Sequence, residues 1–493
     1  MKRVSKVLCV FLAFVMVFST TSIAFAKNQV TPVIVMHGLG GSDLYNNVND
    51  PKNKSMIAQY GLDTEAMLQN QTIVQEALKL LDDGRKTDYN KLFDELGNVL
   101  GSTGFNCTPD GDAQPGQGID CYWTDSLANH PEYFTLRNFS INSFARQIAK
   151  MIGAKNVYAF NFDWRLDVYE TAKQLRSLVV EVKKQTGAKK VTIVGMSLGG
   201  AVMSAYLDAY KGKKDVEKYV FLNGAQLGVD AARLFRLDFQ LNKKSVLSYL
   251  KHLETAFEGG AQHDIFRAVN AFGDARIGTA INKLNRDVCK NPEMRNKLYL
   301  TVMARWMANC PSPWECIPYK DFNVCVEKMS KLGILDKSSG LYKKIKRYHK
   351  IQGRFKSNIK WAKKHGAEVV IIANYGTKGL PLTSKKTNQT DMVIDTKYAS
   401  AGATTAQFGK KLKKKGKYVS PDKAINAATC ALPNNTWFFR GVTHGIFRYD
   451  TQATKLVCKM IVGKVKCTVP AVKKKYGYKQ FIKVDDKQNI SNV

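Results

Sequence analysis

A serine at the junction between a predicted strand and a predicted helix constrains the fold of this chain most strongly. An apolar run at residues 191–194 ends in the motif Gly195-Met-Ser-Leu-Gly199, and a helical pattern follows over residues 200–210. Glycines two positions before and two positions after Ser197 leave room for the sharp turn that such a junction needs. The turn would expose the Ser197 hydroxyl at the carboxyl end of a strand, above a helix N-terminus. Ser197 is therefore a candidate nucleophile.

Strand-like and helical patterns alternate along much of the chain. Further strands are expected at residues 31–36, 157–162, 218–222 and 368–373, and a helix is expected from residue 168 to about 185. Apolar strands that alternate with helices are typical of a parallel sheet whose two faces are both covered. We therefore predict an α/β fold with a mostly parallel sheet and helices on both faces.

Two long segments interrupt this alternation, at residues 42–155 and 226–366. Connections between strands and helices are usually a few residues long, so segments of this size must carry structure of their own. We expect them to form a cap or lid over the functional site. On this basis the main domain spans residues 27–450, and residues 451–493 form a basic C-terminal extension with a small β portion.

The N-terminus has the composition of an export signal. Lys2, Arg3 and Lys6 precede an apolar stretch at residues 7–18, and Ala24-Phe-Ala26 resembles a cleavage site. The alternative is an uncleaved membrane anchor, but the apolar stretch is short for a segment that crosses a bilayer. We predict a signal peptide at residues 1–26 and a secreted mature protein.

Nine of the ten cysteines follow the predicted signal peptide. Disulfides are expected in an exported protein, and several reduced, buried cysteines are the alternative. A two-residue hairpin turn at Val462-Gly463 would place Cys458 and Cys467 opposite each other on paired strands. Cys107 and Cys121 flank a loop rich in glycine, proline and aspartate. The cysteine spacings do not resemble those of a zinc site.

A glycine-rich loop follows the first expected strand, in the motif His37-Gly-Leu-Gly-Gly41. A serine that attacks an ester creates an oxyanion, which needs two backbone N–H donors aimed at it. The loop after the first strand supplies one donor in folds of this type, and the residue after the nucleophile supplies the other. We expect Leu39 and Leu198 to be these donors.

A base and an acid must follow the serine in the order Ser, Asp or Glu, His for this architecture. Of seven histidines, His444 alone lies well beyond the fifth expected strand, and a surface-loop histidine is the alternative reading of that position. We expect Asp391 to be the acid, because it lies after the fifth expected strand, where a carboxylate can orient His444. Asp395 is four residues away and competes with Asp391 for this role.

These motifs carry a resemblance to a known family. The residues concerned are His37-Gly-Leu-Gly-Gly-Ser-Asp-Leu44, Asp163-Trp-Arg165, Gly195-Met-Ser-Leu-Gly-Gly200, Asp391 and His444. They resemble the α/β-hydrolase lipases, and most of all the lecithin:cholesterol acyltransferase and lysosomal phospholipase group, over residues 30–225 and 366–447. The resemblance implies an α/β-hydrolase fold, a mobile lid and a Ser-Asp-His triad acting on lipid acyl esters. Chemistry of this type needs no metal or organic cofactor, and a structural ion is left open.

The chain departs from the usual pattern of this family in two places. Met392 stands where many members have glycine after the catalytic aspartate. Asn223-Gly-Ala-Gln-Leu-Gly228 replaces the Thr-Pro-x-x-Gly motif that usually follows the fourth strand. We expect Asp163-Trp-Arg165 to support the fold rather than to take part in chemistry.

Positive charge dominates the composition, with 75 Lys and Arg against 41 Asp and Glu. Residues 341–366 contain basic residues and no acidic ones, with apolar residues at helical spacing and Gly353 as an interruption. Such a helix could dock on an anionic membrane, or it could simply pack its apolar side on the core. Further lysine runs lie at residues 410–417 and 473–475. Anionic cell-wall polymers are another candidate partner, and attraction to nucleic acid would be incidental.

The motifs together predict a secreted serine esterase or lipase that acts through an acyl-enzyme. Whether water or an alcohol accepts the acyl group is left open, as is a polyester in place of a lipid. The alternative from another class is a non-catalytic protein that keeps the hydrolase scaffold and binds envelopes or polymers through its cationic surface.

Overall fold

The computed structural model describes the chain except for residues 1–29, 120–124, 134–140, 257–260, 380–381 and 383–387. The predicted signal peptide and Cys121 therefore lie outside the described residues. Within the described residues, no helix is both long enough and apolar enough to cross a membrane.

An eight-stranded sheet forms the centre of the fold, with strand order β12-β11-β10-β7-β6-β5-β1-β4. Its strands are β1 (Val33–Met36), β4 (Val157–Phe160), β5 (Val191–Met196), β6 (Val216–Leu222), β7 (Glu368–Tyr375), β10 (Thr436–Arg440), β11 (Phe481–Val484) and β12 (Ile490–Asn492). Neighbouring strands are parallel except for the antiparallel pair β11–β12 at one edge. This is the mostly parallel sheet of the predicted α/β-hydrolase fold.

Helices cover both faces of the sheet, because each buried strand presents apolar side chains to both sides. Val33 and Val35 of β1 pack with α5 (Asn142–Ile152) and α17 (Gln452–Val462) on one face. Ile34 and Met36 pack on the other face with α6 (Val168–Thr186), α7 (Leu198–Tyr210) and α15 (Gly340–Lys364). The sequence prediction of a sheet covered on both faces is confirmed.

The basic segment at residues 341–366 forms α15, an unbroken helix of 25 residues. Its apolar side chains Tyr348 and Phe355 are buried in the main core, and Ile345 is buried in a cluster with residues of the second insertion. The lysines lie on the opposite, solvated side, and exposed Gly353 does not interrupt the helix. Of the two alternatives for this helix, packing of its apolar side on the core is therefore the one that the structure shows.

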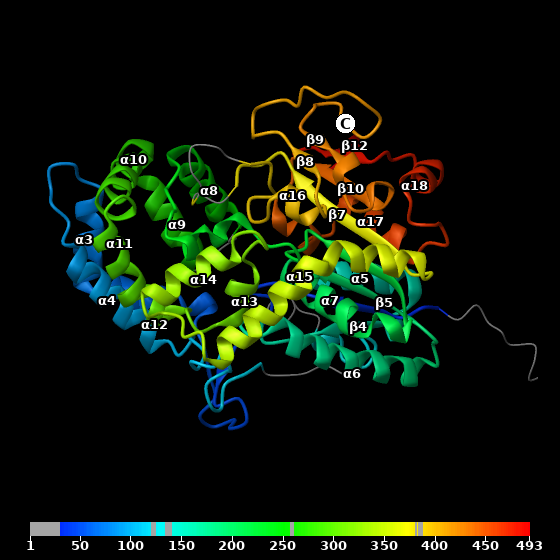
Figure 1. Cartoon of the computed structure of the whole chain (residues 1–493), viewed down its shortest axis with the longest axis horizontal. Coiled ribbons are helices and arrows are strands. Elements are labelled where there is room, and N and C mark those ends of the chain that lie inside the picture. Colours follow the sequence, from blue (N-terminus) through cyan, green and yellow to red (C-terminus); the bar gives the residue numbers. More distant parts are fainter. Residues whose placement is uncertain (1–29, 120–124, 134–140, 257–260, 380–381, 383–387) are drawn as a thin grey trace, which may run out of the picture.

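Helices from both insertions pack together in a lobe at the left of Figure 1. The first insertion supplies α2 (Thr64–Gln69), α3 (Gln71–Leu80) and α4 (Tyr89–Ser102). The second supplies α8 (Lys243–Ala256), α9 (Ala261–Ala271), α10 (Gly273–Leu284), α11 (Pro292–Leu298), α12 (Ala304–Trp306), α13 (Pro311–Glu315) and α14 (Phe322–Lys331). Leu92 and Phe93 of α4 share a buried cluster with Val288 and Val302 of the second insertion.

The C-terminal residues continue the main sheet. Helices α17 and α18 (Val469–Tyr476) lead into β11, which pairs in parallel with β10. The expected hairpin between Cys458 and Cys467 is wrong, because Cys458 lies inside α17, which ends before Gly463. Apolar residues at helical spacing, from Leu456 to Ile461, bury this helix and override the turn signal.

The described cysteines are not joined in disulfides in this structure. All eight of them are buried. The described part of the chain contains no group of three or more His, Cys, Asp or Glu side chains that could hold a metal ion.

Candidate active site

Ser197 occupies the turn between β5 and α7, with φ of 55° and ψ of −121°. The Ser197 N–H donates to the Leu222 carbonyl at 3.1 Å, and the Ser197 carbonyl accepts from Ala225 at 2.8 Å. A Cβ atom on Gly195 would lie 2.5 Å from the carbonyl oxygen of Gly199, and one on Gly199 would lie 2.6 Å from that of His37. The glycines on either side of Ser197 are therefore required by close backbone approach, as the sequence predicted.

The glycine-rich loop after β1 lies directly against this turn. A Cβ atom on Gly38 would lie 2.5 Å from the Cβ of Ser197 and 2.9 Å from its Oγ. The loop closes on itself through a bond of 3.2 Å from the Gly41 N–H to the Gly38 carbonyl. Leu198 is the first residue of α7, so its N–H has no acceptor within the helix. Leu39 lies within the loop and lines the same cavity as Ser197.

His37 supports this loop from below. Its imidazole is completely buried and stacks on Phe162 with ring centroids 4.3 Å apart. Its ring nitrogens contact the Gly38 carbonyl and the Asn161 side chain, each at 2.8 Å. Burial lowers the pKa of His37 to about 4, so the ring is neutral near pH 7. His37 therefore has a structural position and is held by groups other than Ser197.

His444 and Asp391 are joined by a hydrogen bond. Nδ1 of His444 lies 2.7 Å from Oδ2 of Asp391, and the His444 backbone N–H donates to the Asp391 carbonyl at 2.8 Å. Oδ1 of Asp391 accepts the N–H groups of Val393 at 3.0 Å and Ile394 at 2.7 Å. Asp391 is buried, whereas the His444 side chain keeps 17% of its surface exposed. An acidic side chain thus orients an accessible imidazole.

Asp395, the competing acid, has other partners. It precedes α16 (Thr396–Ala399), and its carboxylate accepts from the Asp230 N–H at 2.9 Å and from Asn388 Nδ2 at 2.7 Å. Burial, and then the nearby Asp230 carboxylate, raise the pKa of Asp395 to about 6. Of the two candidates, Asp391 is the one in contact with His444.

Met392, at the position where the sequence departs from glycine, has φ of 81°. Side chains rarely adopt this conformation, which glycine reaches without strain. The conformation turns the chain so that the N–H groups of Val393 and Ile394 reach the Asp391 carboxylate. Met392 therefore adopts the backbone conformation that a glycine would adopt there, at a conformational cost.

Two asparagines link the ends of the central strands, a feature that the sequence analysis missed. The Asn223 N–H donates to the Ile372 carbonyl at 2.9 Å, and Asn223 Oδ1 accepts the Asn374 N–H at 3.0 Å. Asn374 Nδ2 donates in turn to the carbonyl of Thr443, the residue before His444, at 3.1 Å. This ladder runs along the carboxyl edge of the sheet from the Ser197 turn to the His444 loop. The described structure has no direct hydrogen bond from Ser197 Oγ to His444.

An apolar cavity of about 230 Å³ opens beside Ser197. It is lined from the sheet by Leu39, Trp164, Ser197, Val393 and Ile394, and from the two insertions by Tyr60, Phe105, Leu234, Phe235, Met303, Met307 and Cys310, among others. Because its walls are almost wholly apolar, the cavity suits a hydrocarbon chain better than a polar ligand. Residues of both insertions are needed to close it.

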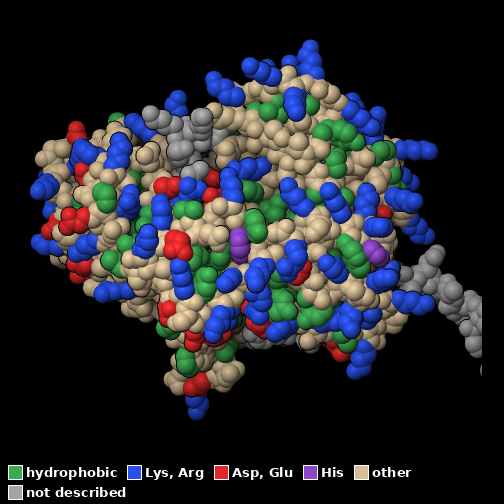
Figure 2. Space-filling model, in the orientation of Figure 1, with side chains coloured by type: hydrophobic (Ala, Val, Ile, Leu, Met, Phe, Trp, Pro, Cys, Tyr) green, Lys and Arg blue, Asp and Glu red, His purple; other side chains and the backbone are tan. Residues whose placement is uncertain are grey.

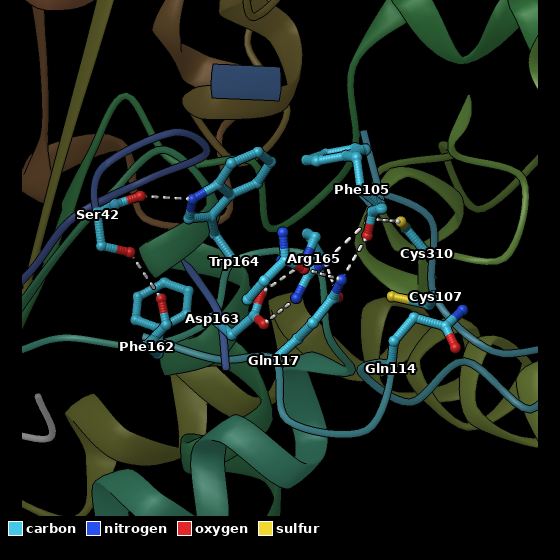
Figure 3. A network of polar contacts seen from close by, with 12 residues as sticks. Ser42, Phe105, Cys107, Gln114, Gln117, Phe162, Asp163, Trp164, Arg165 and Cys310 are labelled. Atoms are coloured by element: carbon cyan, nitrogen blue, oxygen red, sulfur yellow. Dashed lines mark hydrogen bonds and ion pairs between the residues drawn. The ribbon is translucent and has the colours of Figure 1, made fainter. Parts of the chain in front are cut away.

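The Asp163-Trp-Arg165 motif ties the first insertion to the sheet beside this cavity (Figure 3). The buried Arg165 guanidinium donates to both carboxylate oxygens of Asp163, at 3.1 and 2.7 Å, and to the Phe105 carbonyl at 3.0 Å. The Trp164 indole N–H donates to the Ser42 carbonyl at 3.0 Å, just after the glycine-rich loop. The motif supports the fold around the site, as expected.

One family model matches the chain. Residues 140–233 match the model of lecithin:cholesterol acyltransferase, and this segment runs from α5 through Asp163-Trp-Arg165 and Ser197 past β6. A search of curated proteins finds no match. The matched family supports a lipid acyltransferase or esterase activity in general terms. The matched segment and the mostly parallel sheet together place this chain close to the lecithin:cholesterol acyltransferase group of α/β-hydrolases.

Proposed function

We propose that this chain is a secreted serine esterase or lipase that cleaves lipid carboxylic esters through an acyl-enzyme. The observation that carries the proposal is the hydrogen bond between His444 and Asp391 at the sheet edge on which the strained Ser197 turn lies. The apolar cavity beside Ser197 supports the proposal that the enzyme recognises the acyl chain of its substrate.

In the first half-reaction, Ser197 Oγ attacks the ester carbonyl carbon while Nε2 of His444 accepts the hydroxyl proton. Asp391 holds Nδ1 of His444 protonated and stabilises the imidazolium that forms. The N–H groups of Leu39 and Leu198 donate to the oxyanion of the tetrahedral intermediate. The intermediate then collapses, and His444 returns the proton to the departing alcohol.

In the second half-reaction, an acceptor attacks the acyl-enzyme with His444 again as the base. Water gives a free fatty acid, and an alcohol gives a new ester, so hydrolysis and acyl transfer differ only in the acceptor. Both half-reactions require Nε2 of the partly exposed His444 side chain to reach Ser197 Oγ. Hydrogen bonds of this kind often tighten only when substrate is bound.

Export and an anionic lipid surface complete the proposal. Export is supported by the sequence of residues 1–26, which has the composition of an export signal. For the second, residues 410–417 form an exposed loop with Lys410, Lys411, Lys413, Lys414, Lys415 and Lys417. Figure 2 shows Lys and Arg side chains over the top of the visible face, where this loop lies, whereas acidic side chains lie farther down and to the left. Such a loop would attract anionic headgroups at low ionic strength.

The decisive experiment is active-site labelling. A fluorophosphonate probe should label the wild-type protein and the Ser204→Ala variant, which lacks another buried serine of α7, but not the Ser197→Ala variant. Folded wild-type protein that resists the probe and hydrolyses no ester would contradict the proposal. If that protein still bound anionic polymers or envelopes, the non-catalytic binding function would replace it.

The lipid surface is tested separately, with esters of increasing chain length in the presence and absence of anionic vesicles. Vesicles should raise the activity on long-chain esters, and the Lys411→Gln/Lys413→Gln/Lys414→Gln variant should lose most of that gain. A control variant with the same loss of charge, Lys290→Gln/Lys320→Gln/Lys331→Gln, replaces exposed lysines of the second insertion and should keep the gain. Activity confined to short, soluble esters would contradict a lipid substrate. Competition by anionic wall polymers would indicate that the cationic loop binds such polymers rather than a membrane.

A further inference from the structure

Two cysteines from different insertions lie side by side behind the wall of the cavity. Cys107 follows α4 in the first insertion, and Cys310 directly precedes α13 in the second. Their side chains are 1% and 0% exposed. Asn106 Oδ1 accepts the Cys107 N–H at 3.1 Å and lies 3.9 Å from the Cys310 sulfur, and Figure 3 shows the two sulfur atoms near each other.

The contact between these segments does not depend on the sulfur atoms. The Asn309 N–H donates to Asn106 Oδ1 at 3.0 Å, and Asn309 Nδ2 donates to the Cys107 carbonyl at 3.2 Å. Asn106 Nδ2 donates to the Ala304 carbonyl at 2.9 Å. Reciprocal bonds between residues that flank each cysteine fix the two backbones relative to each other. Residues that are 202 positions apart in the sequence are thereby held in register.

This junction also belongs to the cavity wall. Phe105 and Cys310 both line the cavity, and the Cys310 thiol lies 3.8 Å from the Phe105 carbonyl oxygen. The same carbonyl accepts a hydrogen bond from Arg165. A covalent bond at this place would therefore join both insertions at the point where they enclose the cavity.

We propose that Cys107 and Cys310 form a disulfide that fastens the two insertions to each other behind the cavity. The two thiols lose two protons and two electrons when the bond forms. The acceptor is an external disulfide in the export compartment, either of a small molecule or of an oxidoreductase, and it is reduced to two thiols. This inference draws on the export part of the proposed function, because structural disulfides persist in oxidising compartments.

The bond forms during folding, before the insertions close over it. The neighbouring Cys310 thiol, and then burial, raise the pKa of Cys107 well above its ordinary range. Thiolates, not thiols, carry out disulfide exchange, so the folded pair reacts slowly with external thiols. Once formed, the bond is protected in the same way from reductants.

Mass spectrometry of the exported, full-length protein tests the proposal. The protein is purified without reductant, alkylated in denaturant, and digested with trypsin and then with a protease that cleaves after acidic residues. Cleavage at Asp110 and Glu315 separates Cys107 from Cys121 and Cys310 from Cys316. We expect a peptide pair that joins Cys107 to Cys310 and separates on reduction, while Cys458 is alkylated from the start. Alkylation of Cys107 and Cys310 before reduction, or a bond from either to another cysteine, Cys121 included, would overturn the proposal.

A second measurement compares thermal unfolding with and without reductant. Reduction in mild denaturant should lower the Tm of the wild-type protein by about 5 °C, because the bond closes a very long loop. The Cys107→Ala/Cys310→Ala variant should show no such shift, and the Cys458→Ala variant should show the wild-type shift. Equal shifts in all three proteins would also overturn the proposal. Neither measurement uses esterase activity, so an intact cross-link in an inactive protein would count against the proposed function alone.

Discussion

Nδ1 of His444 lies 2.7 Å from Oδ2 of Asp391, while Oδ1 of Asp391 accepts two backbone N–H groups. A carboxylate held in this way can accept only from Nδ1–H of the imidazole, which fixes the tautomer. Nε2 is then the nitrogen without a proton, and it is the one that a serine hydroxyl needs. In the proposed reaction, the pair therefore defines Nε2 as the atom of His444 that accepts the proton.

Replacement of Asp391 by asparagine should reduce kcat by about 10³–10⁴-fold with little change in KM, because the amide favours the wrong tautomer of His444. Steady-state ester hydrolysis measures this. The matched control is Asp395→Asn, which removes a carboxylate that contacts Asp230 and Asn388. That variant should keep kcat within a few-fold of the wild type, and the reverse result would assign the acid to Asp395.

Gly38→Ala should lower kcat/KM by about 100-fold through displacement of the glycine-rich loop from Ser197. The added Cβ would lie 2.5 Å from the Cβ of Ser197, closer than atoms can approach. Fluorophosphonate labelling should slow in parallel. Gly212→Ala places its methyl group where nothing lies within 4 Å, and it should leave both rates unchanged. Full activity of Gly38→Ala would show that the loop does not lie against Ser197.

Burial of neutral His37 should make stability depend on pH. The pKa of His37 is lowered from 6.5 to about 4, so the unfolded chain takes up a proton first as the pH falls. The stability contribution is complete above pH 6.5 and is lost between pH 6.5 and 4. The loss amounts to about 3 kcal/mol from the size of the shift.

Urea unfolding across this pH range measures the effect of His37. The difference in unfolding free energy between the wild type and His37→Gln should shrink as the pH falls, because glutamine does not titrate. His365→Gln, at a surface histidine, should keep the wild-type pH dependence. A constant difference between the wild type and His37→Gln would contradict burial of the neutral ring.

Strain at Met392 should reverse the usual order of stability of alanine and glycine variants. Both Met392→Gly and Met392→Ala remove the buried side chain, but only glycine relaxes at φ of 81°. Met392→Gly should therefore be more stable than Met392→Ala by about 1 kcal/mol in chemical unfolding. At the control position, exposed Lys360 in α15, Lys360→Ala should be more stable than Lys360→Gly by about the same amount. Greater stability of Met392→Ala would show that the backbone is not held at positive φ.

Patterns that reach over a few residues were predictable from the sequence. The strand at β5, the turn at Ser197 and the helix α7 follow from an apolar run, two glycines and a helical pattern next to each other. The glycine-rich loop and the alternation of strands with helices were predictable for the same reason. Boundaries shifted slightly, for example to Val216–Leu222 for β6, because hydrogen bonds to neighbouring strands extend a strand beyond its apolar run.

Features that depend on distant partners were not predictable in the same way. The hairpin at Val462-Gly463 was wrong, because packing of α17 against α5 decides the conformation there. The sequence favoured Asp391 as the acid but left Asp395, four residues away, as a competitor, and only the position of the His444 loop separates them. The roles of Asn223 and Asn374 had no local signal, since each acts through a bond to another strand end.

The sequence by itself determined the α/β class, the serine at a strained turn and the order of the candidate residues along the chain, because backbone sterics and apolar periodicity are local properties. The tertiary structure alone decided which aspartate meets His444, which side of α15 faces water and how the two insertions enclose the cavity. Each of these depends on contacts between segments that are far apart in the sequence, and their free energy exists only after the chain has folded.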